Sequence, residues 1–503
     1  MQSEFISKYW FSENNTEYFI HCGKTGSGKT YNAINKLKSS KSGTYLAPLR
    51  LLAWEIYEKL NSEGFRCSLL TGEEKVQNIG ANFTSSTIEM YNPNKHQEVV
   101  VIDEAFMIGD EDRGKSWLSA IIKANANEVH IITSLEGLPL IEEILTITNR
   151  KYHVKKYEML QEFVFTESRF KLTTKIPNKG IFVTFSRIDC LVNKVKLEAA
   201  GKSVSILYGN LPPEVKKRQI EDFISGKNDV MVATDVIGMG INVPCDYIVF
   251  LKHEKFDGKN YRPLNPSEIR QISGRTGRYG LSAKKSFVSA TEFDSLQHIK
   301  TMYNKPTPVK NAYFGLDFEI YAHLPKSATI KERIQFFLNS ELIPLELKKI
   351  IKKESVLKYF QVEPYIANLN FDIDTEWAFL TAPIKENNKE YFLYTINSFK
   401  ESKKLLSPEL EIVTLYDSKW IEDKISEIEL YLNLSRNLPY EESEKFATIK
   451  QKDVLIQHLD RILLDKKLSS KKKCKLCPSM ISIMYPHHYC NTCYKSKISS
   501  QYY

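Results

Sequence analysis

A membrane-spanning segment is missing from this 503-residue sequence, since no stretch approaches the ~20 consecutive apolar residues that cross a bilayer. The first 19 residues also lack the basic start and apolar run of a secretory leader. They include Glu4, Glu13 and Glu17, whereas transit peptides are poor in acidic residues. No internal repeat with a period of about 20–50 residues is found. These absences predict a globular protein in the cytoplasm, without a membrane partner.

Acidic residues and arginine are absent from residues 466–503, which hold eight of the 70 basic residues. The rest of the chain carries 62 basic and 61 acidic residues, so nearly all of the net charge of +9 lies in this tail. A basic tail favours a polyanionic partner, nucleic acid first. A lysine run is equally consistent with a solvated end of the chain.

Short apolar runs alternate with amphipathic segments in the first half, and the series restarts near residue 180. Runs that predict buried strands span 18–23, 43–48, 98–104, 128–134, 180–185, 203–209, 229–235 and 247–253. Segments that predict helices span 29–38, 48–60, 114–126, 187–201 and 212–227. This alternation implies parallel sheets covered by helices, so the predicted fold class is α/β.

The pattern divides the chain into four units. Residues 1–160 and 161–325 form two α/β domains, joined through a strand-poor segment, about 150–178, that is the predicted hinge. Residues 326–465 form a mainly helical domain, because the strand pattern fades and apolar residues recur at helical spacing. Residues 466–503 form a small basic module with four cysteines.

A phosphate-binding loop is predicted where G-x4-G-K-T follows a predicted strand and precedes a predicted helix. Backbone N–H groups of such a loop surround the phosphates of ATP, its lysine reaches the β- and γ-phosphates, and its threonine ligates Mg²⁺. The predicted loop residues are Gly23, Lys24, Thr25, Gly26, Ser27, Gly28, Lys29 and Thr30. The alternative is a flexible turn rich in glycine, serine and lysine.

Asp103 and Glu104 follow an apolar run at the expected end of another strand in the same domain. We expect Asp103 to hold Mg²⁺, directly or through water, and Glu104 to act as general base toward the attacking water. An isolated Asp-Glu pair also occurs where a strand merely ends in solvent. The position after the P-loop is what favours the catalytic interpretation.

Two arginines, Arg275 and Arg278, each follow a glycine near the end of a predicted helix in the second α/β domain. Asn265 is the predicted cap of this helix, and Glu268 stands three residues after it. An arginine from a second domain reaches the γ-phosphate only when the domains close, and it typically contributes about 10³–10⁵ in rate. The alternative is a helix end whose arginines pair with local carboxylates.

A series of short motifs occurs in the order GKTGSGKT, APLRLLA, TGEE, SSTIEM, DEAF, VATDVIGMGINVP and QISGRTGR. This series resembles superfamily 2 helicases of the DExH type. Longer stretches such as IDEAFMIGDEDRGKSW resemble the mitochondrial RNA-degradosome helicases and their bacterial relatives, over about residues 18–285. The resemblance implies two tandem RecA-like domains, ATP-driven movement with 3′→5′ polarity, and a preference for RNA.

The resemblance also implies roles for single residues. Gln271, Arg275 and Arg278 would face the triphosphate, and Asp235 and Gly240 would link the strand contact to the ATP site. The residues implied to grip strand phosphates are Pro48, Arg50, Thr71, Gly72, Thr87 and Thr234. The sequence departs from the family at Ala105-Phe106, where relatives usually place a polar residue second. SLEGLP replaces Ser-Ala-Thr, and no adenine-reading motif precedes the P-loop.

Four cysteines have the spacing C-x2-C-x12-C-x2-C, namely Cys474, Cys477, Cys490 and Cys493. This spacing predicts a tetrahedral Zn²⁺ site. The alternatives are two local disulfides or a redox pair. Lysines and tyrosines around the cluster favour single-strand binding, although docking of a protein partner or simple stabilisation is the other interpretation.

Together these features predict an ATP-dependent helicase or translocase that uses ATP, Mg²⁺ and Zn²⁺ and moves on single-stranded or partly duplex nucleic acid. RNA is favoured over DNA by the resemblance alone. A protein partner would bind through the helical domain or the zinc module. Two alternatives stay open: a DNA helicase or duplex translocase in repair, phage or defence biology, and an ATP-switched adaptor that binds nucleic acid without unwinding it.

Overall fold

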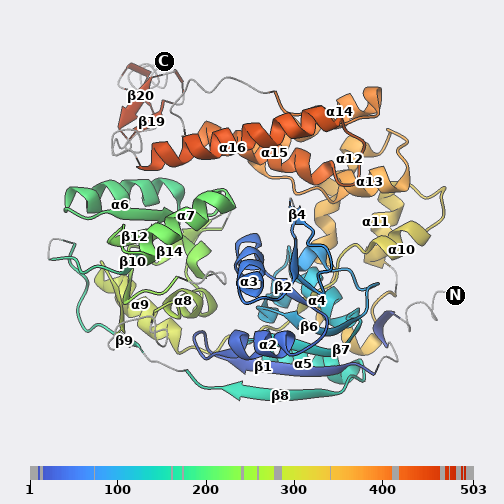
Figure 1. The fold of residues 1–503 in the computed structure, drawn as a ribbon, viewed down its shortest axis with the longest axis horizontal. Helices are drawn as coiled ribbons and strands as arrows, with labels where there is room; N and C mark the ends of the chain where they lie inside the picture. Colours follow the sequence, from blue (N-terminus) through green and yellow to red (C-terminus); the bar gives the residue numbers. More distant parts are fainter. Residues whose placement is uncertain are drawn as a thin grey trace.

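Two β-sheets lie side by side in this protein, and helices of the C-terminal part cross above both (Figure 1). The computed structural model describes residues 9–11, 15–72, 74–159, 163–172, 175–238, 243–257, 260–276, 286–339, 341–409, 418–464, 471–474, 476–477, 479–482, 489–490 and 492–493. Of the helices in these ranges, none has the length and apolar composition needed to span a membrane.

The first sheet has eight strands among the described residues, in the order β4-β3-β5-β2-β6-β7-β1-β8. Its strands are β1 (Glu17–Gly23), β2 (Gly43–Ala47), β3 (Cys67–Leu70), β4 (Lys75–Val76), β5 (Phe83–Thr87), β6 (Gln97–Ile102), β7 (Ala126–Thr133) and β8 (Tyr152–Tyr157). Its helices are α2 (Lys29–Lys38), α3 (Arg50–Ser62), α4 (Gly114–Ile122) and α5 (Leu138–Ile147). Every neighbouring pair is parallel except β3 and β4.

The second sheet has six strands among the described residues, all parallel, in the order β11-β12-β10-β13-β16-β9. These strands are β9 (Phe163–Phe165), β10 (Gly180–Val183), β11 (Val204–Leu207), β12 (Val230–Ala233), β13 (Tyr247–Phe250) and β16 (Ser286–Ala290). Its helices are α6 (Arg187–Ala199), α7 (Pro213–Ile224), α8 (Pro266–Ser273) and α9 (Phe293–Tyr303), and β14 (Glu254–Phe256) pairs with β15 (Tyr261–Pro263). The predicted α/β class with two RecA-like domains is confirmed.

The predicted hinge at 150–178 is not strand-poor. It contains β8, the edge strand of the first sheet, and β9, the edge strand of the second. An edge strand is covered less than a central one, and β8 (YHVKKY) is half-buried only at its two tyrosines. The continuous apolar run that marks a buried strand is therefore missing from it.

The C-terminal part is mainly helical, as predicted. Its helices are α10 (Phe318–His323), α11 (Ile330–Asn339), α12 (Glu363–Ile366), α13 (Ile373–Leu380), α14 (Lys389–Ser402), α15 (Ser418–Leu434) and α16 (Glu442–Leu464). The helical series breaks after α11. Short 3₁₀ helices and β18 (Ile351–Lys352), which pairs with β17 (Ala312–Tyr313), follow Pro344, because proline cannot continue a helix.

One continuous apolar cluster joins the three larger parts of the chain. It contains Ile20 of the first sheet, Ile206 of the second sheet and Ile425 of α15. The helical domain therefore shares its core with both α/β domains, and Figure 1 shows α15 and α16 crossing above them.

Candidate active site and nucleic-acid interface

The P-loop lies between β1 and α2, and its glycines occupy positions that other residues rarely tolerate. Gly26 and Gly28 have φ angles of 79° and 80°, in the left-handed region that favours glycine. A Cβ at Gly23 would lie 2.5 Å from the carbonyl oxygen of Tyr157. A loop of this kind, followed by a helix N-terminus, forms an anion-binding cradle.

Lys29 bends back over the loop that it follows. Its Nζ donates hydrogen bonds to the carbonyl oxygens of Gly23 (2.6 Å) and Lys24 (2.7 Å). Ser27 Oγ donates to the same Lys24 oxygen at 2.8 Å. Burial lowers the pKa of Lys29, while the charges of Glu104 and Asp103 act in the opposite direction. The ammonium group is thus held within reach of both the cradle and the acidic pair.

Asp103 and Glu104 follow β6 at the same edge of the sheet. Asp103 is buried and accepts hydrogen bonds from the Tyr45 hydroxyl (2.5 Å) and from the Glu104 N–H (2.8 Å). Burial, and then the charge of Glu104, raises the pKa of Asp103 to about 7. A buried carboxyl group, oriented by two donors beside a phosphate cradle, fits the oxygen ligands that Mg²⁺ prefers.

Helix α8 begins at the predicted cap. Asn265 Oδ1 accepts from the Glu268 N–H at 2.9 Å, and Glu268 Oε2 accepts from the Asn265 N–H at 2.8 Å. The predicted capping box is therefore confirmed. Further along the helix, Gln271 Nε2 donates to Ser267 Oγ at 3.0 Å.

The end of α8 points at the P-loop. A Cβ at Gly274 would lie 2.7 Å from the Cβ of Thr25, so only glycine allows this approach. Arg275 is 2% exposed, and its Nη2 donates to the carbonyl oxygen of Gly238 at 2.6 Å. The second domain thus presents this arginine to the first domain in a fixed orientation.

A cavity of about 880 Å³ lies between the P-loop and α8, and both α/β domains line it. We call it the nucleotide cavity, after the function that the P-loop motif predicts. Its volume falls within the ~300–1,000 Å³ usual for small-ligand sites. The predicted catalytic residues that line it are Lys29, Asp103, Glu104, Gln271 and Arg275. All eight predicted loop residues, from Gly23 to Thr30, line it as well. Gly240 and Arg278 lie outside the described residues.

The residues expected to grip the strand lie where strands end. Pro48 and Arg50 follow β2, and Thr71 and Gly72 follow β3. Thr87 closes β5 in the same sheet, and Thr234 follows β12 in the other. Parallel strands place these ends at one edge of each sheet, which is where open α/β sheets bind ligands.

Several of these positions have partners from elsewhere in the chain. Asn433 Nδ2, on α15, donates to the carbonyl oxygen of Gly72 at 3.2 Å, and Arg436 donates to that of Thr71. Arg50 pairs with Glu429 of α15 at 3.3 Å. These contacts show that the helical domain covers part of the edge of the first sheet. Thr71, Thr87 and Thr234 are buried.

Residues 9–157 match the family described as the DEXQ-box helicase domain of Suv3, and residues 155–280 match the helicase conserved C-terminal domain. The chain belongs to the superfamily 2 helicases. The box reads Asp103-Glu104-Ala105-Phe106 in this helicase, so Phe106 stands where the family description has glutamine. Phe106 also lines the nucleotide cavity.

Curated relatives are RNA helicases of the Suv3 group. The mitochondrial ATP-dependent RNA helicase SUV3 of Saccharomyces cerevisiae is 33% identical over 75% of this chain and 54% of its own length. That of Candida albicans is 38% identical over 59% of this chain and 43% of its own length. The mitochondrial DExH-box ATP-dependent RNA helicase DExH16 of Arabidopsis thaliana is 29% identical over 90% of this chain and 81% of its own length.

The chain spans about half the length of the SUV3 relatives that it matches. Among solved structures, S. cerevisiae Dbp5 bound to RNA and ADP BeF3 matches 60% of this chain and 87% of that chain, with a TM-score of 0.44 and 18% identity. The family assignment therefore rests on the sequence matches.

The expectation of a cytoplasmic location is wrong by this comparison, because these relatives are named as mitochondrial proteins. The expectation rested on the composition of residues 1–19. Transport receptors recognise a targeting signal that is separate from the folded domains. The motifs of the two α/β domains therefore carry no information about location.

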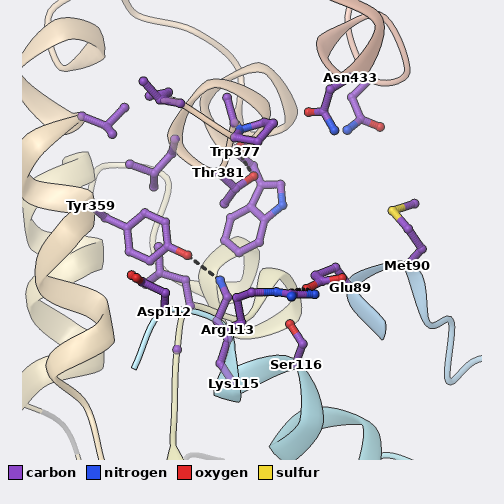
Figure 2. A pocket seen from close by; sticks show the side chains of 18 of the residues that line it. Glu89, Met90, Asp112, Arg113, Lys115, Ser116, Tyr359, Trp377, Thr381 and Asn433 are labelled. Carbon is purple, nitrogen blue, oxygen red and sulfur yellow. Dashed lines mark hydrogen bonds and ion pairs between the residues drawn. The ribbon is translucent and has the colours of Figure 1, made fainter. Parts of the chain in front are cut away.

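A second and larger cavity, of about 1760 Å³, lies between the first α/β domain and the helical domain (Figure 2). Its cationic lining residues are Lys75, Arg113, Lys115, Lys358, Lys385, Lys389, Arg436 and Lys445. Its acidic lining residues are Glu89, Asp112, Asp317 and Glu386. Aromatic rings of Tyr9, Tyr91, Tyr359, Tyr365, Trp377 and Tyr440 complete it. We call this cavity the basic groove.

The basic groove begins beside the expected strand grips. Arg113 pairs with Glu89 at 2.7 Å and also donates to the carbonyl oxygen of Pro48. Lys115 donates to the hydroxyl of Tyr359, and Figure 2 shows this contact beside Trp377. Sequence reasoning missed the groove, because its walls come from α4, 3₁₀ helices and the helical domain, and no motif joins them.

An ion pair across the two α/β domains was also missed. Arg270 of α8 pairs with Glu136 of the first domain at 2.8 Å, and both residues line the nucleotide cavity. Arg270 Nη1 donates in addition to the carbonyl oxygens of Tyr303 and Lys305. The signal was present, since Glu136 lies in SLEGLP, where the chain departs from Ser-Ala-Thr.

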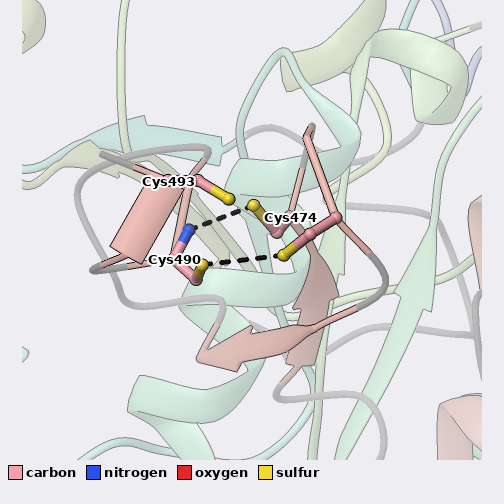
Figure 3. A group of neighbouring side chains, drawn as sticks. Cys474, Cys490 and Cys493 are labelled. Carbon is pink, nitrogen blue, oxygen red and sulfur yellow. Dashed lines mark hydrogen bonds between the residues drawn. The ribbon is translucent and has the colours of Figure 1, made fainter. Parts of the chain in front are cut away.

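The four clustered cysteines meet in space. Their sulfur atoms all lie within 4.8 Å of one another, and Figure 3 shows the side chains converging. Cys477 Sγ and Cys490 Sγ are 3.6 Å apart, far beyond the ~2.05 Å of a disulfide. Four thiolates at ~2.3 Å from a tetrahedral zinc lie about 3.8 Å apart, so the cluster fits the metal.

The strands β19 (Lys471–Lys473) and β20 (Met480–Ser482) form the antiparallel hairpin that carries the first cysteine pair. Burial acts to raise the pKa of the Cys474 thiol, but backbone N–H donors of Cys490 and Leu476 outweigh it and lower the pKa to about 6. The Cys490 N–H lies 3.1 Å from Cys474 Sγ. Thiolates are the form that binds zinc.

Proposed function

We propose that this helicase hydrolyses ATP between its two α/β domains in order to move along single-stranded nucleic acid and unwind duplexes. The observation that carries the proposal is the 880 Å³ cavity, which both domains line with motif residues. RNA is the favoured substrate, because the relatives are named RNA helicases. The relatives' names also favour a mitochondrial location.

In the proposed reaction the P-loop and Lys29 hold the β- and γ-phosphates, and Glu104 takes the proton of the attacking water. Mg²⁺, held by Thr30 and Asp103, would neutralise charge on the phosphates. Gln271, Arg275 and Arg278 would stabilise the charge that develops on the γ-phosphate, which requires the second domain to stay against the first. Hydrolysis and domain movement would thereby be coupled.

We infer a strand path along the grip residues and into the basic groove. Pro48, Arg50, Thr71, Gly72, Thr87 and Thr234 would contact the backbone of the strand. The lysines and arginines of the groove would meet its phosphates, and rings such as Trp377 would stack on bases. Because phosphates dominate these contacts, binding should be largely independent of sequence and sensitive to salt.

The proposed division of labour follows the predicted units: 1–160 and 161–325 for ATP, 326–465 for the strand path, and 466–503 for a zinc module. Zn²⁺ on Cys474, Cys477, Cys490 and Cys493 would hold that module together. The module would add cationic contacts to the strand or dock a protein partner.

A stimulation assay tests the proposal. ATPase rates are measured with no nucleic acid, single-stranded RNA, single-stranded DNA and duplex, with Lys29→Ala as the inactive control. Stimulation by single-stranded RNA above the others is the expected result. Stimulation only by DNA would make the protein a DNA helicase or translocase. Nucleic-acid binding without hydrolysis under any condition would leave the ATP-switched adaptor.

A further inference from the structure

Helix α15 carries two carboxylates, the buried Glu422 and the half-buried Glu429, that reach different α/β domains. Glu422 and Glu429 are seven residues apart, which is two helical turns, so they lie on one face about 10 Å apart. Glu422 contacts the second α/β domain, and Glu429 contacts the first. The helix therefore connects the two domains whose relative position the ATP cavity requires.

The contact with the second domain is tight. Arg187 Nε donates to both carboxylate oxygens of Glu422, at 2.8 and 3.0 Å, and the Tyr208 hydroxyl donates to one of them at 2.7 Å. Ser418 Oγ accepts a further bond from Arg187. Glu422 is 3% exposed. Charge-assisted bonds of this length in a buried site are strong, so Glu422 anchors α15 to the second domain.

The contact of Glu429 with the first domain has longer distances, and several cations share the carboxylate. Arg50 Nη2 lies 3.3 Å from Glu429, and Lys385 and Lys452 lie 3.8 and 3.9 Å from the same carboxylate. Burial alone would raise the pKa of Glu429, but Arg50, Lys452 and Lys385 outweigh it and lower the pKa. Glu429 is therefore ionised and faces several cations without the close geometry of Glu422.

Several cations of the described residues lie around Glu429. Lys216 is half-buried there and donates to the carbonyl oxygen of Gly209 at 2.7 Å; desolvation, and next the charge of Arg50, lowers its pKa to about 8. Glu214 is the second carboxylate and lies 3.5 Å from Lys452. Among the described residues, four cations gather around Glu429 and Glu214, namely Arg50, Lys216, Lys385 and Lys452.

The contacts of α15 with the first domain coincide with the expected strand grips. Besides Glu429 on Arg50, Asn433 reaches Gly72, and Arg436, two residues after the end of α15, reaches Thr71. A phosphodiester carries one negative charge and two oxygens that suit an arginine as well as a carboxylate does. A strand at this edge therefore competes with Glu429 for Arg50.

We propose that Glu429 is a positioning residue for strand entry: its carboxylate holds the Arg50 guanidinium at the sheet edge until a backbone phosphate replaces it. The proposal rests on the proposed function, since it needs a strand that binds at Arg50. Because α15 is anchored on the second domain through Glu422, release of Arg50 frees the first domain from one of its links to the helix. Strand entry is thereby connected to domain movement.

Glu429→Gln tests the proposal by binding of a fluorescent single-stranded oligouridine to the full-length protein. Glutamine keeps the size of the side chain and removes the competing charge, so affinity should rise on the order of 3- to 10-fold. Glu422→Gln is the matched control, because it makes the same change to a carboxylate on the same face of the same helix, away from Arg50. The affinity of the Glu422→Gln protein for the oligouridine should stay within about twofold of that of the unmodified protein.

The gain must depend on Arg50. In an Arg50→Gln background, the substitution of Glu429 should no longer raise affinity, because the two residues act through one contact. A gain that persists without Arg50 would mean a general charge effect and would overturn the proposal. Equal or weaker binding by a folded Glu429→Gln protein, checked by circular dichroism, would overturn it as well.

Glu429→Asp covers the case in which the glutamine variant does not fold. Aspartate keeps the negative charge near Lys385 and Lys452 but draws it back from Arg50. A smaller gain in affinity is therefore expected, and the absence of any gain would overturn the proposed role of Glu429. Failure of the proposed function has a different outcome. In that case the unmodified protein binds neither RNA nor DNA, whereas failure of this proposal leaves that binding intact.

Discussion

Charged residues at the nucleotide cavity are held in place by neighbours from their own domains. Carbonyl oxygens of the P-loop hold Lys29, the Tyr45 hydroxyl holds Asp103, and the carbonyl oxygen of Gly238 holds Arg275. Groups oriented in this way need little reorganisation when charge develops on a phosphate. In the proposed reaction the three residues would therefore be oriented before the substrate is bound.

Replacement of Arg275 by alanine should reduce hydrolysis by about 10³-fold or more, because it removes positive charge from the γ-phosphate side of the cavity. ATP affinity should change only a few-fold, since the P-loop of the first domain supplies the phosphate cradle. Steady-state ATPase rates and titration with a fluorescent ATP analogue measure the two effects.

Arg66→Ala removes an exposed arginine outside the cavity and serves as the matched control. If ATP affinity fell as far as turnover in Arg275→Ala, the arginine would be a binding residue rather than a transition-state residue. For Arg278→Ala the sequence motif alone predicts the same result: hydrolysis should fall strongly, and ATP affinity should change only a few-fold.

At the scale of elements, α8 connects the cavity at the P-loop to the second domain. Its start is fixed by Asn265 and Glu268, and its end approaches Thr25 so closely that Gly274 has no room for a Cβ. Midway, Arg270 pairs with Glu136 from the loop between β7 and α5. This loop replaces the Ser-Ala-Thr segment, so the ion pair is a route by which the two domains sense each other.

Glu136→Gln should lower ATPase activity about tenfold and leave the fold intact, because it removes one side of this interdomain pair. Arg270→Gln should have a similar effect, and the double variant should be no worse than either single one. A double-mutant cycle on ATPase rates should give a coupling energy of about 1–3 kcal/mol. Additive effects of the two substitutions would show that the pair does not couple the domains.

At the scale of the whole molecule, the helical domain is part of the core rather than an appendage. One apolar cluster runs through both sheets and α15, and ion pairs of α15 and α16 reach both ATPase domains. In the proposed function, movement between the two α/β domains would therefore change the shape of the strand path that they share with these helices.

Deletion of residues 466–503 should weaken binding of single-stranded nucleic acid more than it changes the ATPase rate without nucleic acid. The tail carries eight lysines and no acidic residue, and each lost phosphate contact should reduce the salt slope by about 0.7 for a single strand. Affinity measured over a series of salt concentrations tests this. Unchanged affinity and salt slope would assign the module to protein docking.

Much of the α/β fold could be predicted, because its central strands are continuous apolar runs such as VVVI before Asp103. Two strands of the first sheet without an apolar run were missed: the interior strand β5 reads FTSST and the edge strand β8 reads YHVKKY. The segment after Pro344 was expected to be helical, since its apolar spacing is helical, but it pairs with β17 through contacts that no local pattern reveals.

The P-loop, the Asp-Glu strand end, the cap of α8 and the cysteine spacing are local in the sequence, so the order of residues alone determines them. The contact between Arg50 and Glu429 joins residues 379 positions apart, and that between Lys115 and Tyr359 joins residues 244 apart. Such pairs exist only because the helical domain folds back over the edges of both sheets. The tertiary structure therefore decided the basic groove, the Glu136–Arg270 pair and the position of Glu429, since each depends on which surfaces the apolar core brings together.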